Sequence, residues 1–285
     1  MKNLAIITGA DGGMGTHQTL ALAKAGFHVI MACYDTEAAE PVRQRIVSES
    51  SNEDIEVIGL NLADLSSVHD FAKNVIRRGQ RIDRLMCNAG CLETHRHTTT
   101  DGLEWTVSVN YMGHYLLTRQ LLPLMSKGSR VVCMSSCSYL IGRLDMPDFF
   151  HRGRKGRWQR FMVYGNTKLA LVLFVRHLAE IVKDRGITVN AADPGIVDTG
   201  IIRLHNWVDL LTDLIYRPLI NTPAQGAATA IHLMLSPDVE GITGGYFKNS
   251  RQITLPRRII SHPMTAKLWS ESEHIVTPWL NLSEQ

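Results

Sequence analysis

Short apolar runs alternate with amphipathic stretches along most of this chain. Runs with the length and composition of buried strands lie at Leu4–Ile7, Phe27–Ala32, Ile55–Leu60, Asp83–Cys87, Arg130–Met134 and Ile187–Ala192, with a last strand expected at Tyr246-Phe247. Between them the apolar positions recur at helical spacing, and long helices are expected at Leu103–Met125 and Phe161–Lys183. Alternating strands and helices are typical of a parallel sheet covered on both faces, so we predict one α/β domain with about seven strands.

A tyrosine and a lysine lie on one face of the second long helix. Lys168 follows Tyr164 by four residues, which stacks their side chains. A free phenol titrates near ~10, but a neighbouring ammonium favours the phenolate and lowers the pKa of the phenol. The tyrosine could then exchange a proton with an alcohol or a ketone. An ordinary helix face is the alternative, because the spacing also arises by chance.

A glycine-rich segment joins the first strand to a helix. It reads Thr8-Gly9-Ala10-Asp11-Gly12-Gly13-Met14-Gly15, and the helix after it stops near Gly26, before the second strand. Glycines let the backbone bend and approach a pyrophosphate, and the N–H groups and dipole at a helix start attract its negative charge. The order of strand, glycine turn, helix and strand predicts a dinucleotide-binding loop, with a merely flexible loop as the alternative.

Composition narrows the function classes. The chain has 285 residues, and its formal charge of +3 is too small to indicate nucleic acid as a partner. The five cysteines lack zinc-site spacing and are expected to be reduced, buried thiols: Cys33, Cys87, Cys91, Cys133 and Cys137. His95 and His97 are expected at the surface, and no metal site is expected. Without a leader or an apolar run of about 18 residues, the protein is expected to be soluble and cytoplasmic, with at most peripheral membrane contact.

Further signals follow other strands in a fixed order, and together they make the first 250 residues resemble the short-chain dehydrogenase/reductase family. The matching positions are Thr8, Gly9, Gly13 and Gly15 in the glycine motif, Asn88-Ala89-Gly90, Asn110, Ser136, Tyr164 with Lys168, and Pro194, Gly195, Val197 and Thr199. The resemblance implies a single Rossmann domain over residues 1–285 that binds NAD(P)(H) and moves a hydride between the nicotinamide and a substrate carbon.

The resemblance also implies a catalytic set. Tyr164 would exchange a proton with the substrate oxygen, and Ser136 would hydrogen-bond that oxygen. Lys168 would lower the tyrosine's pKa, hold the nicotinamide ribose and pass protons toward a water near Asn110. Two alternatives stay open: Ser135 could be the active hydroxyl, and Asn110 could be a simple cap or a polar core residue.

The cofactor signals are mixed. Where the family places an acidic residue for NAD or an arginine for NADP, the chain has Cys33 and Tyr34, and Asn61-Leu62 replaces the usual Asp-Leu near the adenine. Asp11 would repel the extra phosphate of NADP, so we expect a slight preference for NAD. Arg43 and Arg45 are expected to be solvated. The expected cofactor contacts are Thr8, Gly9, Asp11, Gly13, Met14, Gly15, Cys33, Tyr34, Asn61, Leu62, Asn88, Ala89, Gly90, Tyr164, Lys168, Pro194, Gly195, Val197 and Thr199.

The long interval between Ser136 and Tyr164 holds an insertion, about 137–160. Together with the Pro194-Gly195-Ile196-Val197 loop and the late Tyr246-Phe247 and Leu268-Trp269 elements, it makes the chain resemble the retinol-dehydrogenase-type branch, whose substrates are lipophilic alcohols, aldehydes and ketones. Its basic run His151–Arg160 is expected to be a solvated loop, or else to steer an anionic substrate or rest on an anionic membrane. An apolar substrate lid is expected at about 196–222, although its stripe could be core. An extension at about 250–285 would pack on the lid or mediate contacts in a homodimer or homotetramer.

Two other functions remain possible. Relatives with much of the same constellation reduce carbon–carbon double bonds, and some proteins with this fold bind a dinucleotide only to sense redox state or to scaffold partners. Since Tyr164 and Lys168 are both present, an enzyme acting on an alcohol or carbonyl is favoured.

Overall fold

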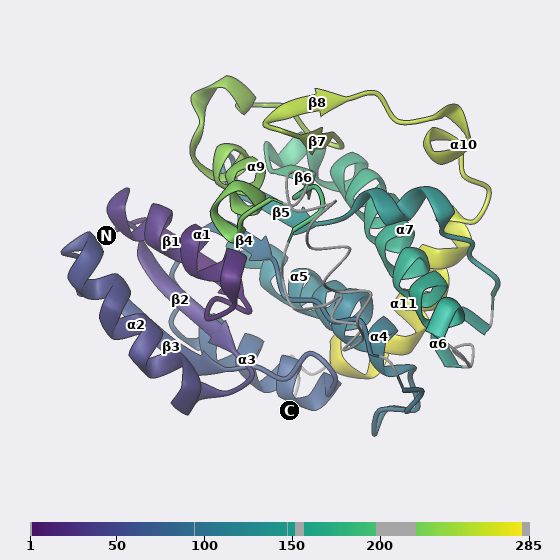
Figure 1. The fold of residues 1–285 in the computed structure, drawn as a ribbon, viewed down its shortest axis with the longest axis horizontal. Helices are drawn as coiled ribbons and strands as arrows, with labels where there is room; N and C mark the ends of the chain where they lie inside the picture. The colour runs from purple at the N-terminus through teal and green to yellow at the C-terminus, as the bar shows by residue number, and fades with distance from the viewer. Residues whose placement is uncertain (1, 94, 147, 152–156, 198–220, 281–285) are drawn as a thin grey trace, which may run out of the picture.

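The computed structural model describes residues 2–93, 95–146, 148–151, 157–197 and 221–280, which form one α/β domain (Figure 1). The elements, in chain order, are β1 (Leu4–Thr8), α1 (Gly13–Lys24), β2 (His28–Cys33), α2 (Thr36–Ser50), β3 (Ile55–Gly59), α3 (Leu65–Arg77), β4 (Ile82–Cys87), α4 (Trp105–Val107), α5 (Gly113–Leu121), β5 (Arg130–Met134), α6 (Asp148–His151), α7 (Arg157–Val182), β6 (Thr188–Asp193), α9 (Pro223–Leu235), β7 (Tyr246–Lys248), β8 (Arg251–Ile253), α10 (Arg257–Ile260) and α11 (Thr265–Leu280).

The sheet has the order β3-β2-β1-β4-β5-β6-β7-β8. The first seven strands run parallel, and β8 pairs with β7 in the antiparallel direction. This eighth strand is one more than expected, because its three residues are exposed and show no apolar pattern. After β3 the chain crosses over β1 to start β4. In sheets of this kind ligands bind at the carboxyl ends of the strands where the order reverses, which here lies between β1 and β4.

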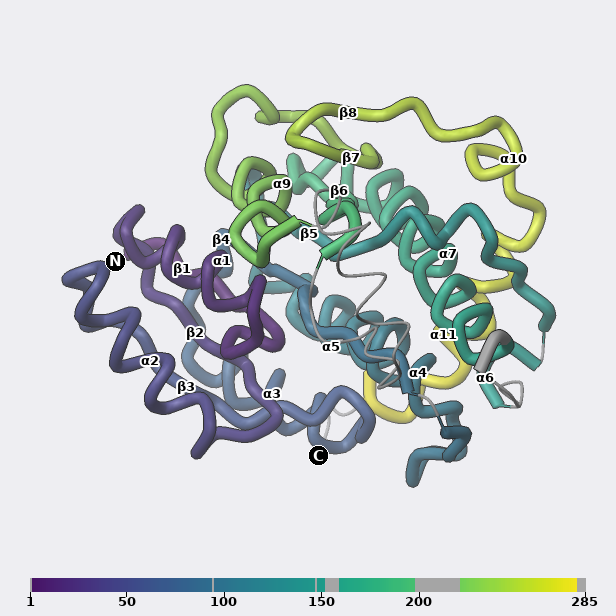
Figure 2. Tube along the Cα trace, viewed as in Figure 1, coloured from purple at the N-terminus to yellow at the C-terminus, as the bar shows by residue number. Residues whose placement is uncertain are grey.

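The two faces of the sheet carry separate hydrophobic cores. Along β1, Leu4 and Ile6 pack with apolar residues of α3, α5 and α7, whereas Ala5 and Ile7 pack with those of α1, α2 and α9. Figure 2 shows α1 beside α9 and α11 beside α7, in agreement with their contacts. The alternation of buried side chains to both faces confirms the doubly wound arrangement.

The helix expected over Leu103–Met125 is not continuous. It consists of α4, a π-helix at Ser108–Met112, α5 and a final 3-10 turn at Leu122–Leu124. At Gly113 the backbone passes very close to the segment after β3: a Cβ added at this glycine would lie 2.6 Å from the Leu62 carbonyl oxygen. Such π turns often occur at functional sites, and this one contains Asn110.

The C-terminal helix α11 completes one of the two cores. The Trp269 ring lies 5.2 Å from that of Tyr115 and 6.1 Å from that of Phe174. Ser272 shares a 2.9 Å hydrogen bond with the Tyr111 hydroxyl. The extension thus packs on α5 and α7. Within the described residues, no helix combines the length and the apolar character needed to cross a bilayer.

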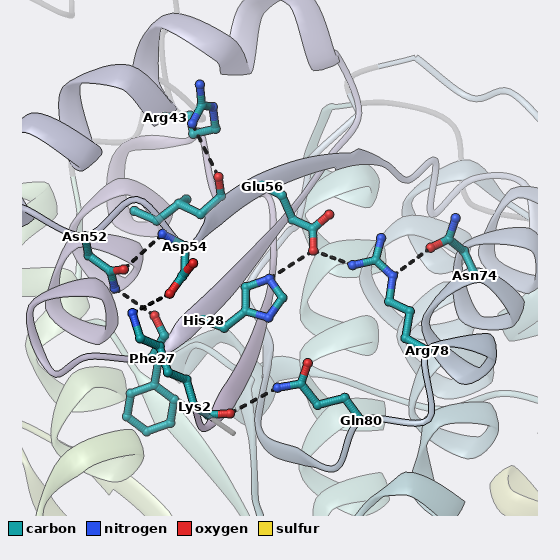
Figure 3. A network of polar contacts seen from close by, with 11 residues as sticks. Lys2, Phe27, His28, Arg43, Asn52, Asp54, Glu56, Asn74, Arg78 and Gln80 are labelled. Carbon is teal, nitrogen blue, oxygen red and sulfur yellow. Dashed lines mark hydrogen bonds and ion pairs between the residues drawn. The ribbon is translucent and has the colours of Figure 1, made fainter.

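Polar side chains hold the amino-terminal edge of β1–β3 (Figure 3). The Glu56 carboxylate bonds His28 Nε2 at 3.0 Å and also pairs with Arg78. Asn52 donates from Nδ2 to the Ala23 and Phe27 carbonyls at 2.9 and 2.8 Å. These contacts fix the strand starts, at the edge of the sheet opposite to the glycine loop.

Candidate active site

A cavity of about 500 Å³ opens at the carboxyl ends of β4, β5 and β6. Its lining is mostly apolar and combines the glycine loop, the segments after β4 and β5, α7 and the loop after β6. The lining residues are Met14, Asn88, Gly90, Leu92, Met134, Ser135, Ser136, Cys137, Ser138, Leu140, Ile141, Phe161, Tyr164, Lys168, Pro194, Gly195, Ile196 and Val197. Residues that were expected from separate motifs therefore meet in one site.

Tyr164, Lys168 and Ser136 lie together in this cavity. Both residues of the pair come from α7, and Lys168 Nζ lies 5.3 Å from the centroid of the Tyr164 ring. Ser136 lines the same cavity as Tyr164, and its hydroxyl is close enough to lower the pKa of the tyrosine. The Ser135 hydroxyl is instead buried and has no hydrogen-bond partner among the described residues. The structure thus places Ser136, rather than Ser135, against the tyrosine.

Burial dominates the electrostatics of the pair. It raises the pKa of Tyr164 to about 12, and the Ser136 hydroxyl offsets part of that rise. Desolvation lowers the pKa of Lys168 to about 8, and its Nζ donates to the Met134 carbonyl at 2.9 Å. The pKa of Tyr164 is therefore raised by burial, whereas the neighbouring ammonium was expected to lower it.

Asn110 uses its side chain to join two parts of the site. Its Nδ2 donates to the Cys91 carbonyl at 2.9 Å and to Thr167 Oγ1 at 3.1 Å, and its Oδ1 accepts from the Cys91 N–H at 2.7 Å. The amide thereby ties the segment after β4 to α7. A role in holding a relay water stays a prediction.

His114, which sequence reasoning did not single out, connects the glycine motif to the π-helix. Its Nε2 lies 2.9 Å from Thr8 Oγ1, and its Nδ1 lies 3.3 Å from the Asn110 carbonyl oxygen. A carbonyl can only accept, so we assign the ring proton to Nδ1 and the Thr8 hydroxyl as donor to Nε2. Burial lowers the pKa of His114 to about 4, which keeps the ring neutral. A lone histidine between apolar helix positions gives no signal of such a role in the sequence.

The Thr8 hydroxyl oxygen also accepts hydrogen bonds from the segment after β4. The N–H groups of Asn88 and Ala89 donate to it at 2.9 and 3.0 Å. Asn88 Nδ2 in turn donates to the carbonyls of Thr8 and Gly9 at 3.0 and 3.2 Å. One threonine thereby holds β1 and β4 together at the point where the strand order reverses.

The glycine loop has the shape that a pyrophosphate requires. Gly9 has φ +59°, and a Cβ added at Gly15 would lie 2.0 Å from the Gly9 carbonyl oxygen. Gly12 caps α1 without a side-chain hydrogen bond, and the first turn contains no acidic residue. The N–H groups at the helix start are thus not covered by a capping side chain. These residues fit a bound dinucleotide.

The side chains at the end of β2, which are expected near the adenosine, are neutral or acidic. Burial, aided by the nearby Asp11 carboxylate, raises the pKa of the Cys33 thiol to about 12. The Tyr34 side chain is 73% exposed. On the next segment, Asn61 Oδ1 accepts the Ala63 N–H at 3.0 Å, and Leu62 is buried in the core.

Of the two arginines of α2, Arg45 is exposed as expected, whereas Arg43 is engaged by a carboxylate. Arg43 is half-buried and bonds Glu40 at 2.6 Å, and Arg45 lies 3.7 Å from Glu49. The Glu40 contact engages the guanidinium of Arg43, so that arginine is not a free cation near the end of β2.

On the nicotinamide side, the loop after β6 forms a tight turn. Gly195 has φ +75°, and Asn221 Nδ2 donates to the Pro194 carbonyl at 2.8 Å. Val197 pairs with Asn221 in an isolated bridge. Thr199 and residues 201–220 of the expected lid lie outside the described residues.

The basic insertion is only partly described, and the expectation that Arg160 is exposed to solvent is wrong. Arg160 was expected in a solvated basic run, yet its side chain is 1% exposed. Its Nη2 donates to Glu104 Oε1 at 2.6 Å and to Thr106 Oγ1 at 2.9 Å, and its Nε donates to the Glu93 carbonyl. The buried carboxylate explains the difference, because it compensates the charge of the arginine. Residues 152–156 lie outside the described ranges.

The cysteines and histidines match the expectations with two exceptions. All five cysteines are free thiols, but Cys91 is only half-buried and Cys137 is exposed, because both lie in segments that border the cavity. His95 and His97 are exposed, and the described ranges contain no cluster of potential metal ligands.

Comparisons with known proteins agree with this geometry. Residues 3–147 match the sequence profile of the short chain dehydrogenase family, and residues 149–248 match one described as enoyl-(acyl carrier protein) reductase. Mouse retinol dehydrogenase 13 is 33% identical over 278 residues, which cover 95% of this chain and 83% of that protein. Mouse polyprenol dehydrogenase is also 33% identical, over 94% of this chain and 82% of that protein.

A solved structure shares nearly the whole architecture. An uncharacterized protein from Mycobacterium paratuberculosis aligns with a TM-score of 0.76 at 28% identity, covering 96% of this chain and 93% of that one. The cavity, the glycine loop and these relatives lead to one assignment. The chain belongs to the short-chain dehydrogenase/reductase family, in the retinol-dehydrogenase-type branch, and is an oxidoreductase that acts on CH–OH groups.

Proposed function

We propose that the protein transfers a hydride between NAD(P)(H) and a lipophilic alcohol, ketone or aldehyde, with Tyr164 as the acid–base group. The observation that carries the proposal is that Tyr164, Lys168 and Ser136 meet in one mostly apolar cavity between the glycine loop and the loop after β6. A substrate oxygen placed between Tyr164 and Ser136 would meet both hydroxyls.

The residues would divide the proton chemistry between them. A bound nicotinamide nucleotide would supply or accept the hydride. In oxidation, the Tyr164 phenolate would accept the hydroxyl proton of the alcohol, and in reduction the Tyr164 phenol would donate its proton to the carbonyl oxygen. Ser136 donates a hydrogen bond to the same oxygen and stabilises its negative charge. The positive charge of Lys168 favours the phenolate.

The cavity wall supports a large apolar substrate. Leu92, Leu140, Ile141, Phe161 and Ile196 line it, and Ile196 is 56% exposed. An apolar wall with a few convergent hydroxyls is typical of a site for a hydrophobic ligand. The names of the relatives, retinol and polyprenol dehydrogenase, point to the same chemistry. We therefore propose a retinoid-, steroid- or bile-acid-like substrate.

For the cofactor we propose a preference for NAD. The Asp11 carboxylate lies near Cys33 at the end of β2, and it would repel the extra phosphate of NADP there. Arg43 is engaged by Glu40. Fluorescence titrations with NADH and NADPH test this, and tighter binding of NADPH would overturn it. The Asp11→Asn variant should bind NADPH more tightly than the parent does.

Reduction of a double bond is a second candidate, because residues 149–248 match a profile described for an enoyl reductase. One experiment separates the possibilities: nucleotide oxidation or reduction is followed against retinoids, steroids, fatty aldehydes and enones. Turnover of alcohols and carbonyls supports the proposal, turnover of enones alone supports the second candidate, and nucleotide binding without any turnover indicates a sensor.

A further inference from the structure

A buried carboxylate that the mechanism above does not use lies beside the site. Asp193 is the last residue of β6 and is 2% exposed. Its Oδ1 accepts the Gly195 N–H at 2.9 Å, and its Oδ2 accepts the Tyr246 hydroxyl at 2.6 Å. Neither of these partners carries a positive charge. The fold therefore keeps a negative charge in its interior, compensated at these contacts only by two hydrogen bonds.

The first hydrogen bond shapes the loop on the nicotinamide side. Gly195 adopts φ +75°, a conformation that glycine takes readily, and a Cβ at this position would lie 2.5 Å from Asn221 Nδ2. Asp193 and Asn221 thus hold the turn from two sides, since Asn221 donates to the Pro194 carbonyl.

The second hydrogen bond connects this loop to another segment that lines the cavity. Tyr246 lies on β7, and its ring packs 4.9 Å from that of Tyr139. Tyr139 belongs to the short 3-10 helix Cys137–Ile141, which begins directly after Ser136. The carboxylate thereby joins the Pro194-Gly195 turn, through two aromatic rings, to the segment that presents the active hydroxyl.

We propose that Asp193 is a positioning residue of the reaction site: it fixes the Gly195 turn and supplies a buried negative charge that acts on Tyr164 and Lys168. The inference rests on the function proposed above. A negative charge favours the neutral phenol over the phenolate and the ammonium over the amine. Accordingly, Asp193 adds to burial in raising the pKa of Tyr164, and for Lys168 it offsets part of the lowering of the pKa that burial causes.

The other titratable groups around the pair are mostly thiols. Cys137 and Cys91 are near enough to influence the pKa of Tyr164, and Cys91 and Cys133 that of Lys168. Burial raises the pKa of Cys91 to about 12, and the hydrogen bond to Cys87, together with burial, raises that of Cys133. These two thiols are therefore neutral at neutral pH. Asp193 also raises the pKa of Tyr139, after burial, and Arg258 lowers it. Among the titratable groups named here, Asp193 is the one carboxylate.

The charge can be removed without removing the hydrogen bonds. In Asp193→Asn, the amide oxygen still accepts from Gly195 and the amide nitrogen can donate to the Tyr246 oxygen. Tyr246→Phe is the complementary variant, because it keeps the charge and removes one bond. Asp83→Asn is the matched control: Asp83 is also buried and accepts the Leu4 N–H at 2.9 Å, but it lies at the opposite edge of the sheet.

The first measurement needs neither nucleotide nor substrate. The titration of Lys168 is followed by NMR of isotope-labelled lysine ε-carbons, with its resonance identified by its loss in Lys168→Met. The midpoint is expected at about 8 in the parent. It should fall by about one pH unit in Asp193→Asn, the size expected for a nearby buried charge. It should stay unchanged in Tyr246→Phe and Asp83→Asn. An unchanged midpoint in Asp193→Asn would overturn the proposal, and Asp193→Ser gives the same reading if the asparagine variant does not fold.

The second measurement is the pH profile of turnover in both directions. In Asp193→Asn, the pKa of Tyr164 should be lower than in the parent, so the phenolate forms at lower pH. As the pH is raised, the increase in the rate of alcohol oxidation and the decrease in the rate of carbonyl reduction should therefore both occur at lower pH than in the parent. Identical profiles would contradict the inference. If the parent is inactive toward every substrate while the Lys168 midpoint still moves, the proposed function fails and the charge effect of Asp193 stands.

Discussion

Arg160 Nη2 donates to Glu104 Oε1 at 2.6 Å, and both side chains are 1% exposed. Removing one partner of a buried ion pair leaves an uncompensated charge in the interior. We therefore expect Arg160→Met to lower the free energy of unfolding by about 3–5 kcal/mol, measured by urea denaturation. Arg45→Met is the control, because Arg45 is exposed and its contact with Glu49 is 3.7 Å long. Equal effects of the two substitutions would show that the buried pair is not essential for stability.

Tyr164→Phe should separate chemistry from binding. The phenyl ring fills the same space but cannot exchange a proton, so kcat should fall by about a hundredfold or more while the nucleotide still binds. Steady-state kinetics and a nucleotide titration measure the two effects. Tyr115→Phe serves as control, because Tyr115 bonds Glu273 on α11, away from the cavity. Substantial turnover by Tyr164→Phe would rule out the proposed acid–base role.

Gly15→Ala should disrupt the nucleotide loop. The added methyl group would lie 2.0 Å from the Gly9 carbonyl oxygen, so the backbone must move, at a cost of about 1–3 kcal/mol in stability. We expect a lower unfolding temperature without nucleotide and a greatly weakened nucleotide affinity. At Gly12 the corresponding distance is 3.4 Å, and Gly12→Ala should therefore unfold like the parent without nucleotide. If Gly15→Ala is as stable as the parent, the loop can accommodate the methyl group and the prediction is wrong.

His114 should make the fold sensitive to acid. Burial lowers its pKa from 6.5 to about 4, so the unfolded chain binds the proton first as the pH falls. The stability that the neutral ring contributes is complete above pH 6.5 and is lost progressively between pH 6.5 and 4, by about 3 kcal/mol. Urea denaturation across this range should show a weaker pH dependence in His114→Asn than in the parent. The exposed His97 offers a control, and a similar loss of slope in His97→Asn would contradict the assignment.

The sequence was sufficient for the elements that are apolar and regular. The strands around Ile6, Ile30 and Val132 are buried on both faces, and such runs are recognisable without structural information. The Tyr164–Lys168 pair and the glycine loop were predictable because each depends on local spacing. The structure brings them together with Ser136 in one cavity.

The remaining features depend on partners that are distant in sequence. Arg160 was read as a solvated charge because Glu104, which compensates it, lies on another segment. Asn110, in the π turn, bonds Cys91 and Thr167, which are distant in the chain, and no local pattern encodes these contacts. The last strand was missed because an exposed edge strand of three residues needs no apolar periodicity.

The polar network in Figure 3 has a practical consequence for work with this protein. It lies at the strand starts, whereas the cavity opens at the strand ends, so the sheet itself separates the two. Lys2 and Gln80 are therefore suitable attachment points for a dye, a surface or a fusion partner. An enzyme tethered there presents its cavity to the solution, with the full thickness of the domain between the tether and the chemistry.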